Sequence, residues 1–286
     1  MRDLSGYAFS LLRPGELALY QGQGDGLRSI LLVSPAGEPV PRRSLDRLDH
    51  EYSLRDQLDP SWAAQPISLS RRDDRPALVL EYPGGQLLSR ILGKPLDITQ
   101  FLEIAGPLTT ALRRTHEAGL IHKDIKPENV LLDAARGKVW LTGFGFASRL
   151  PRERQLPEPV ETIAGTLAYM APEQTGRMNR PVDSRSDLYA LGVTFYEMLV
   201  GELPFKASEP LEWVHCHVAR QPISPRRRIL TVPEPIASIV MKLLSKAAEE
   251  RYQTAAGVES DLRRCLHEWK QLGRIDQFSP GAYEPG

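Results

Sequence analysis

The stretch at residues 121–132 constrains the fold of this chain more than any other. It reads Ile-His-Lys-Asp-Ile-Lys-Pro-Glu-Asn-Val-Leu-Leu, so Asp124, Lys126 and Asn129 stand in a loop just before an apolar strand. A carboxylate, an ammonium group and a carboxamide at this spacing suit phosphoryl transfer. The carboxylate accepts a proton from an attacking hydroxyl, the lysine neutralises charge on the moving phosphoryl group, and the amide oxygen holds a metal ion. The stretch therefore predicts a phosphoryl-transfer site.

Length, charge and cysteine content favour a globular protein of the cytoplasm. At 286 residues the chain can bury two lobes, and its formal net charge of +0 creates no field that would attract nucleic acid or an anionic membrane. Its two cysteines, far apart, suit a reducing compartment. The N-terminus lacks the apolar run of a signal peptide, and the most apolar stretch, 188–200, is too short to cross a bilayer. We expect a cytoplasmic protein with no nucleic-acid partner and no membrane insertion.

The first third of the chain predicts a small sheet with one helix. Apolar runs separated by Gly and Pro read as strands at 7–12, 17–21, 28–33, 65–70 and 76–80. Residues 44–58 read as a helix capped by Ser44, with Leu48 and Tyr52 on its apolar stripe. Glu51 falls either on the inward face of this helix or on its solvated face, and the pattern leaves both places open.

The glycine-rich segment at 22–26 is interpreted as a hairpin turn. It lies between the second and third predicted strands, where Asp25-Gly26 suits a tight turn. The junction between the first and second strands is Arg13-Pro-Gly-Glu16, a turn with a single glycine. Glycine patterns are weak evidence for phosphate binding outside the right context, so we assign no phosphate cradle here.

Beyond residue 100 the pattern becomes helical. Apolar residues at helical spacing run up to Gly119, which suits a helix C-cap, and 138–141 reads as a strand. Two further apolar stripes, at 236–243 and 258–269, predict helices that complete a larger helical part.

These segments resemble the eukaryotic-type serine/threonine protein kinase domain. The stretch at 121–132 is similar to the kinase catalytic loop H-R-D-x-K-x-x-N, with Lys123 in place of the arginine. Residues 165–173 resemble the substrate-docking loop that ends in A-P-E. Residues 187–192 resemble the D-x-W-x-x-G of a buried helix, with Tyr189 for tryptophan.

The resemblance covers about residues 7–271 and implies an α+β, two-lobed protein kinase-like fold. A small, mostly-β N-lobe with one helix would span residues 1–82, and a larger, mostly-α C-lobe would span 83–272, leaving 273–286 as a linker or tail. The amino-acid sequences of 165–179 and 239–253 are similar to those of one bacterial subgroup, in which the kinase-like domain lies at the N-terminus of a large signalling protein. An ATPase-type domain, a sensor domain and often a histidine kinase follow it there, so a longer chain is expected.

The resemblance also implies roles for individual residues. Asp124 would be the catalytic base, assisted by Lys126, and Asn129 would bind metal. The backbone of the hinge, at Glu81 and Tyr82, would contact adenine, and Glu51 would be the glutamate partner of a phosphate-binding lysine. The structural and substrate-loop residues would be His122, Thr166, Glu173, Asp187 and Arg251, with Glu173 and Arg251 paired. Thr162 and Thr166 are the candidate phosphorylation sites.

Three features of active kinases are missing. The third strand should carry a lysine that pairs with the α- and β-phosphates, but its matching position is Leu32 or Ser34, and no lysine precedes Lys94. Gly143 replaces the aspartate of the D-F-G motif, which binds magnesium. The glycine-rich loop is absent as well. Arg28, Arg42 and Arg43 lie nearby, but a guanidinium at a shifted position is not an equivalent donor.

These departures predict a pseudokinase, a kinase fold that serves as a regulatory or docking module in bacterial signal transduction. Its partners would be proteins or other domains of the same longer chain. Two alternatives stay open: a weakly active ATP-dependent Ser/Thr kinase that uses Asp124 as its base, and an interaction module that binds no nucleotide. The family implies ATP and Mg2+ as cofactors, whereas the missing lysine and aspartate argue against both.

Overall fold

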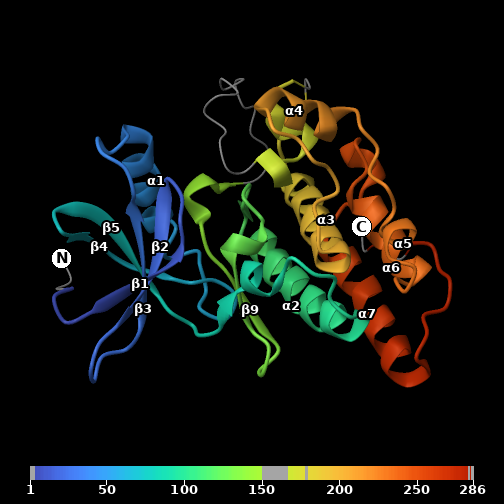
Figure 1. The fold of residues 1–286 in the computed structure, drawn as a ribbon, viewed down its shortest axis with the longest axis horizontal. Coiled ribbons are helices and arrows are strands. Elements are labelled where there is room, and N and C mark those ends of the chain that lie inside the picture. The colour runs from blue at the N-terminus through green and yellow to red at the C-terminus, as the bar shows by residue number, and fades with distance from the viewer. Residues whose placement is uncertain (1–3, 150–166, 178–179, 283, 285–286) are drawn as a thin grey trace.

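The structure is a computed structural model that describes residues 4–149, 167–177, 180–282 and 284. Figure 1 shows two lobes side by side, a smaller one built from the N-terminal strands and a larger one built mainly from helices. The catalytic-loop stretch lies between them, at the start of β8 (Val130–Asp133). The candidate site thus sits where the two lobes meet.

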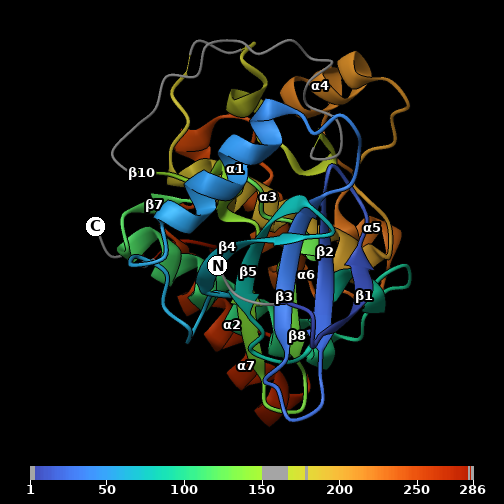
Figure 2. The same ribbon diagram turned by 90° about the vertical axis from the view of Figure 1, so that its left-hand side faces the viewer.

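The smaller lobe is a five-stranded antiparallel sheet in the order β1-β2-β3-β5-β4, with one helix beside it (Figure 2). Its elements are β1 (Ala8–Arg13), β2 (Leu17–Gln23), β3 (Ile30–Pro35), α1 (Arg42–Ser53), β4 (Pro66–Arg72) and β5 (Arg75–Glu81). The predicted strands are confirmed to within about two residues. The glycine-rich segment forms the β2–β3 turn, in which the Leu27 N–H donates to the Gly24 carbonyl at 3.1 Å.

Helix α1 begins and ends earlier than the prediction. Its N-cap is Pro41, and it ends at Ser53 rather than at Leu58. Ser44 lies inside the helix, fully buried, and its hydroxyl donates to Glu16 Oε1 at 2.6 Å instead of capping. The Ser44 cap prediction was therefore wrong, because a tertiary partner on the β1–β2 turn competes for the hydroxyl.

The two faces of β3 pack against different clusters, and this corrects the expected lysine position. Leu31 and Val33 join a cluster that faces the other lobe, whereas Leu32 joins the outer face of the sheet. The Ser34 hydroxyl, on the Leu32 face, donates to the Pro76 carbonyl at 3.0 Å. Because side chains alternate along a strand, the inward positions are Leu31 and Val33, not Leu32 or Ser34. None of these side chains carries a charge.

The larger lobe is built around α3 (Ser184–Val200), whose residues are almost all buried. The other helices are α2 (Ile98–Glu117), α4 (Pro210–Val218), α5 (Pro225–Arg228), α6 (Glu234–Leu243) and α7 (Ala255–Leu272). Single 3-10 turns are η1 (Leu88–Ile91), η2 (Pro127–Asn129), η3 (Phe144–Phe146), η5 (Leu167–Tyr169), η6 (Pro172–Thr175) and η7 (Ala248–Glu250). An all-round apolar helix such as α3 needs neighbours on every side, which α2 and α6 help to supply.

Short strands line the side of the larger lobe that faces the sheet. They are β6 (Gln86–Leu87), β7 (Leu120–Ile121), β8, β9 (Lys138–Leu141) and β10 (Ser148–Arg149). β6, β8 and β9 form one small sheet and β7 and β10 another, so both ends of the catalytic-loop stretch are held by strand pairing. In the part of the chain that the structure describes, no helix has the length and apolar character needed to span a membrane.

Candidate functional site

The catalytic-loop side chains converge on Asp124. Its Oδ2 accepts hydrogen bonds from Asn129 Nδ2 at 2.8 Å and lies 3.0 Å from Lys126 Nζ. Its Oδ1 is buried and has no hydrogen-bond partner among the described residues. A carboxylate oriented through one oxygen, with the other left open, has the geometry of a proton acceptor. The sequence-predicted trio Asp124, Lys126 and Asn129 is therefore brought together.

The side chains of Asp187 and His122 hold the backbone of the catalytic loop by hydrogen bonds. The buried Asp187 carboxylate accepts from the N–H groups of His122 at 2.8 Å and Lys123 at 2.7 Å, and it lies 2.9 Å from His116 Nε2. His122 Nε2 donates to the Thr142 carbonyl at 3.0 Å, and its Nδ1 accepts from the Asp124 N–H at 3.2 Å. Burial lowers the pKa of His122, which keeps the ring neutral in this arrangement.

Glu173 and Arg251 form the buried pair that the resemblance implies. Arg251 donates from both terminal nitrogens, to Glu173 Oε1 at 2.7 Å and to Oε2 at 2.9 Å. The arginine side chain is fully buried and also donates to the Ser245 and Lys246 carbonyls. Such a bidentate pair fixes η6 relative to the loop before α7, and Arg251 Nη1 also donates to the Arg185 carbonyl at the start of α3 at 3.0 Å.

Gly143 leaves no room for the aspartate that active kinases place there. Its φ is +80°, and a Cβ built on it would lie 2.8 Å from Asn129 Oδ1 and 2.9 Å from Asn129 Cγ. The Asn129 carboxamide therefore occupies the space beside Gly143. Gly143 itself offers no side-chain ligand to a metal ion, and the Asn129 side chain packs where a side chain at position 143 would begin.

Glu51 points inward, which decides between the two places left open by its helix pattern. Its side chain is 2 % exposed, and its carboxylate faces the backbone N–H groups of 143–145. Burial raises the pKa of Glu51 to about 7, although these N–H groups and the Arg13 guanidinium favour its charged form. In the described part of the chain, Glu51 Oε1 finds no hydrogen-bond partner. The glutamate thus supports the Gly143 segment instead of pairing with a lysine.

Glu51→Gln should change how stability depends on pH. The pKa of Glu51 is about 7 in the folded protein against an ordinary 4.5, so the folded state holds the extra proton between those values. The free energy of unfolding therefore falls as pH rises through this window in the wild type, and the glutamine variant lacks that loss. We expect the variant to gain roughly 2–4 kcal/mol relative to the wild type between pH 4.5 and 8, measured by urea unfolding.

Glu103→Gln, on an exposed face of α2, is the matched control for this experiment and should run parallel to the wild type. A constant difference between Glu51→Gln and the wild type across the pH range would contradict the assignment.

Arg13 is the site residue that the sequence interpretation missed. It closes β1, and its guanidinium reaches across the lobes, with Nη1 donating to Asn129 Oδ1 and, at 3.2 Å, to the Glu128 carbonyl. The other terminal nitrogen donates to the Leu17 carbonyl at 3.3 Å. The arginines considered from the sequence lie elsewhere: Arg42 is exposed beside Asp46, and Arg43 pairs with Glu16. The sequence did contain a signal for Arg13, because it lies at the turn between the first two strands, where active kinases carry their glycine-rich loop.

Apolar side chains from both lobes fill the space beside the hinge. Leu19, Leu31 and Leu80 of the sheet belong to one cluster with Leu87 and Leu131 of the larger lobe. Each of these five side chains is at most 1 % exposed. A ring the size of adenine cannot enter between them without displacing leucine side chains from a close-packed contact.

The hinge residues Glu81 and Tyr82 offer little to a nucleotide. The Glu81 N–H donates to the Gln65 carbonyl at 2.8 Å, and Pro83 has no N–H at all. The Tyr82 hydroxyl donates to the Gly85 carbonyl at 2.5 Å. Of the three backbone positions 81–83, Glu81 therefore has its N–H engaged and Pro83 has none to offer.

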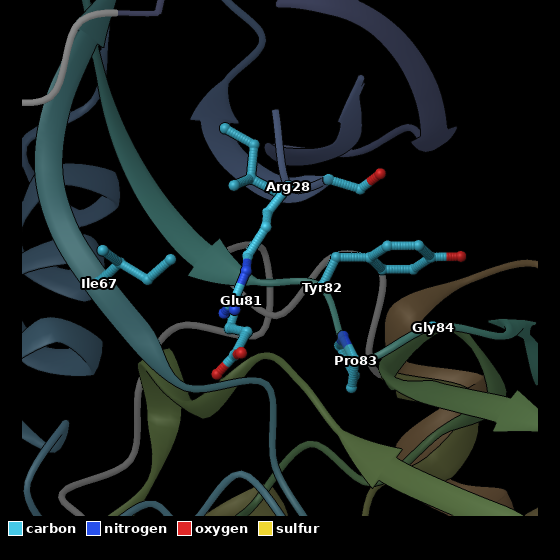
Figure 3. A pocket seen from close by; sticks show the side chains of 8 residues that line it. Arg28, Ile67, Glu81, Tyr82, Pro83 and Gly84 are labelled. Carbon is cyan, nitrogen blue, oxygen red and sulfur yellow. The ribbon is translucent and has the colours of Figure 1, made fainter. Parts of the chain in front are cut away.

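The pocket at the hinge opens on the outer face of the sheet, not into the space between the lobes. Figure 3 shows Arg28 above Glu81, with the Tyr82 ring pointing away from both. The pocket has a volume of ≈ 550 Å³ and is lined by Arg28, Ser29, Ile30, Ile67, Glu81, Tyr82, Pro83 and Gly84. Ile30 belongs to the outer-face cluster, which places the Glu81 side chain, opposite it in the ladder, on the same outer face.

The two candidate phosphorylation sites, Thr162 and Thr166, lie outside the described residues.

Comparison with known proteins places the chain in a family. The model for the protein kinase domain matches residues 42–262, so the match begins after β3. The serine/threonine-protein kinase PknB of Mycobacterium leprae is 36 % identical over 191 residues, covering 66 % of this chain and 30 % of that protein. The serine/threonine-protein kinase PksC of Streptomyces coelicolor is 32 % identical over 217 residues, covering 74 % of this chain and 37 % of that protein.

The chain spans about a third of the length of these curated relatives. Its two-lobed architecture, with a β-rich N-terminal lobe and a helical C-terminal lobe, agrees with the predicted fold class. The chain belongs to the protein kinase domain family.

Proposed function

We propose that this domain is a pseudokinase, a kinase fold that transfers no phosphate and serves as a regulatory or docking module in signal transduction. The observation that carries the proposal is the leucine cluster beside the hinge. Leu31 and Leu131, from opposite lobes, have no exposed surface at all. In the part of the chain that the structure describes, these leucines fill the space beside the hinge in which adenine would have to lie.

The polar half of the site supports the same function. Kinases use ATP with Mg2+, which the D-F-G aspartate and the catalytic-loop asparagine hold. Here Gly143 has no ligand atom, and Asn129 Oδ1 already accepts a hydrogen bond from Arg13. Among the described residues, no three acidic, histidine or cysteine side chains gather at one place. The residues present therefore do not fit ATP and Mg2+, and we derive no transfer step.

A titration of the wild-type domain with ATP tests this proposal directly. Binding to the folded state raises the melting temperature with ligand concentration, so we expect no shift up to millimolar ATP, with or without MgCl2. In a phosphotransfer assay with labelled ATP, wild type and Asp124→Asn should give the same background. A magnesium-dependent shift, or labelling that Asp124→Asn abolishes, would overturn the proposal.

The docking role adds a second readout to the same variant. In the longer protein that we propose carries this domain, its partners would be other domains of that chain or separate proteins. Asp124→Asn should leave the signalling output of that protein unchanged, because the module would act through its folded surface. A lost output with a normally folded variant would point to catalysis.

A weakly active Ser/Thr kinase is the alternative, and the open oxygen of Asp124 is the observation that favours it. The carboxylate is held by Asn129 and Lys126 with Oδ1 unpartnered, as a proton acceptor requires. Substitute metal ligands are harder to find. Asp133 ends β8 and pairs with Arg136, at the far end of the strand from Asn129, while Glu51 faces backbone N–H groups.

A further inference from the structure

A β-bulge in β1 directs Arg13 into the space between the lobes. Leu11 pairs with Tyr20, but Arg13 pairs with Leu19, so one extra residue is inserted between them. Leu19 faces the interlobe cluster and Tyr20 faces outward. Because opposite residues share a face, the bulge places Arg13 on the inner face. In regular pairing Arg13 would oppose Ala18 and point outward.

The groups around Arg13 include the asparagine that holds a metal ion in active kinases. Its guanidinium donates to the Asn129 amide oxygen and to the Glu128 carbonyl. Asp124, Glu51 and Glu128 are the carboxylates whose charges act on it. Among the described residues, each of the three keeps one buried oxygen without a hydrogen-bond partner, and Asp124 and Glu51 are buried as whole side chains. Buried carboxylates of this kind require a nearby positive charge, which Lys126 supplies to Asp124 from the larger lobe and Arg13 supplies from the smaller one.

We propose that Arg13 is the resident cation of this site. Its guanidinium would supply the positive charge that Mg2+ and the strand lysine bring to this region in active kinases, neutralise Asp124 and Glu51, and join the lobes through Asn129. The inference deepens the proposed pseudokinase function, since a built-in cation leaves the site no need of a metal. It also explains why the chain can keep Asp124, Glu51 and Asn129 together without any lysine from the smaller lobe.

The expected result is that removing the guanidinium exposes a divalent-cation site. We would compare the wild type with Arg13→Ala in EDTA and in MnCl2. In EDTA the variant should melt roughly 4–8 °C lower, because it loses charge-assisted hydrogen bonds and leaves carboxylates uncompensated. Mn2+ should raise its melting temperature in a saturable way and leave the wild type unchanged. Loss of the free Mn2+ signal in electron paramagnetic resonance would count the bound ions.

Three further variants sharpen the comparison. Arg42→Ala, at a side chain 91 % exposed, should behave as the wild type. Arg13→Ala combined with Asp124→Asn should lose the response to Mn2+, because a ligand is gone. Arg13→Lys keeps the positive charge but loses the planar set of guanidinium donors, so it should fold with intermediate stability and bind no Mn2+. This last variant keeps the test decisive if the alanine variant does not fold.

Two results would overturn the inference. One is an Arg13→Ala variant as stable as the wild type and indifferent to Mn2+. The other is an Arg13→Lys variant that binds Mn2+, whether or not the alanine variant folds, since charge would then not be what excludes the metal. Neither depends on ATP, so they differ from the results that would contradict the pseudokinase function itself.

Discussion

Arg251→Ala is expected to lower the free energy of unfolding by about 3–5 kcal/mol, because it leaves the buried Glu173 carboxylate without its partner. Arg251 is fully buried and Glu173 is 4 % exposed. Removing the arginine also deprives the Ser245 and Lys246 carbonyls of a donor. Urea unfolding of the variant, followed by circular dichroism, measures the loss.

The exposed pair of Arg180 and Glu249 provides the control for this experiment. Both side chains are at least 40 % exposed, and surface pairs contribute at most about 1 kcal/mol. Arg180→Ala should therefore change stability by less than that. A cost for Arg251→Ala as small as the one for Arg180→Ala would show that the buried pair does not anchor the larger lobe.

Gly143→Asp, which rewrites the motif toward that of an active kinase, is expected to destabilise the protein by about 2–4 kcal/mol and to restore no activity. The backbone there has φ +80°, and the new Cβ would lie within 2.9 Å of three atoms of the Asn129 side chain. Asn129 is held by Asp124 and Arg13 and cannot move without breaking those bonds. Chemical unfolding and a phosphotransfer assay measure the two outcomes.

Gly137→Asp separates backbone strain from the collision. Gly137 has φ +61°, and a Cβ there would meet nothing within 4 Å. Its variant should cost only about 1 kcal/mol, since aspartate tolerates the left-handed conformation in open space. Adding Asn129→Ala to Gly143→Asp should recover part of the loss. A stable Gly143→Asp variant with new kinase activity would instead favour the weakly active kinase.

Much of the fold could be predicted because kinase motifs combine local pattern with chemistry. The strands of the sheet, the helix that carries Glu51 and the loop trio follow from spacing and residue type, whereas the pair of Glu173 and Arg251 was implied by the resemblance to the kinase family. Glu51 shows what the sequence pattern could not decide. Helical periodicity allowed both an inward and a solvated place, and only the packing of α1 against residues 143–147 decided between them.

The sequence by itself determined what the site lacks: no lysine on β3, no aspartate at Gly143 and no glycine loop, because an absent residue type is absent in any conformation. Only the tertiary structure decided what stands in their place. A single bulge in β1 turned Arg13 inward, and β-strand pairing chose Leu31 and Val33 as the residues facing the other lobe. Those outcomes depend on register, and a shift of one residue moves a side chain to the opposite face of a sheet.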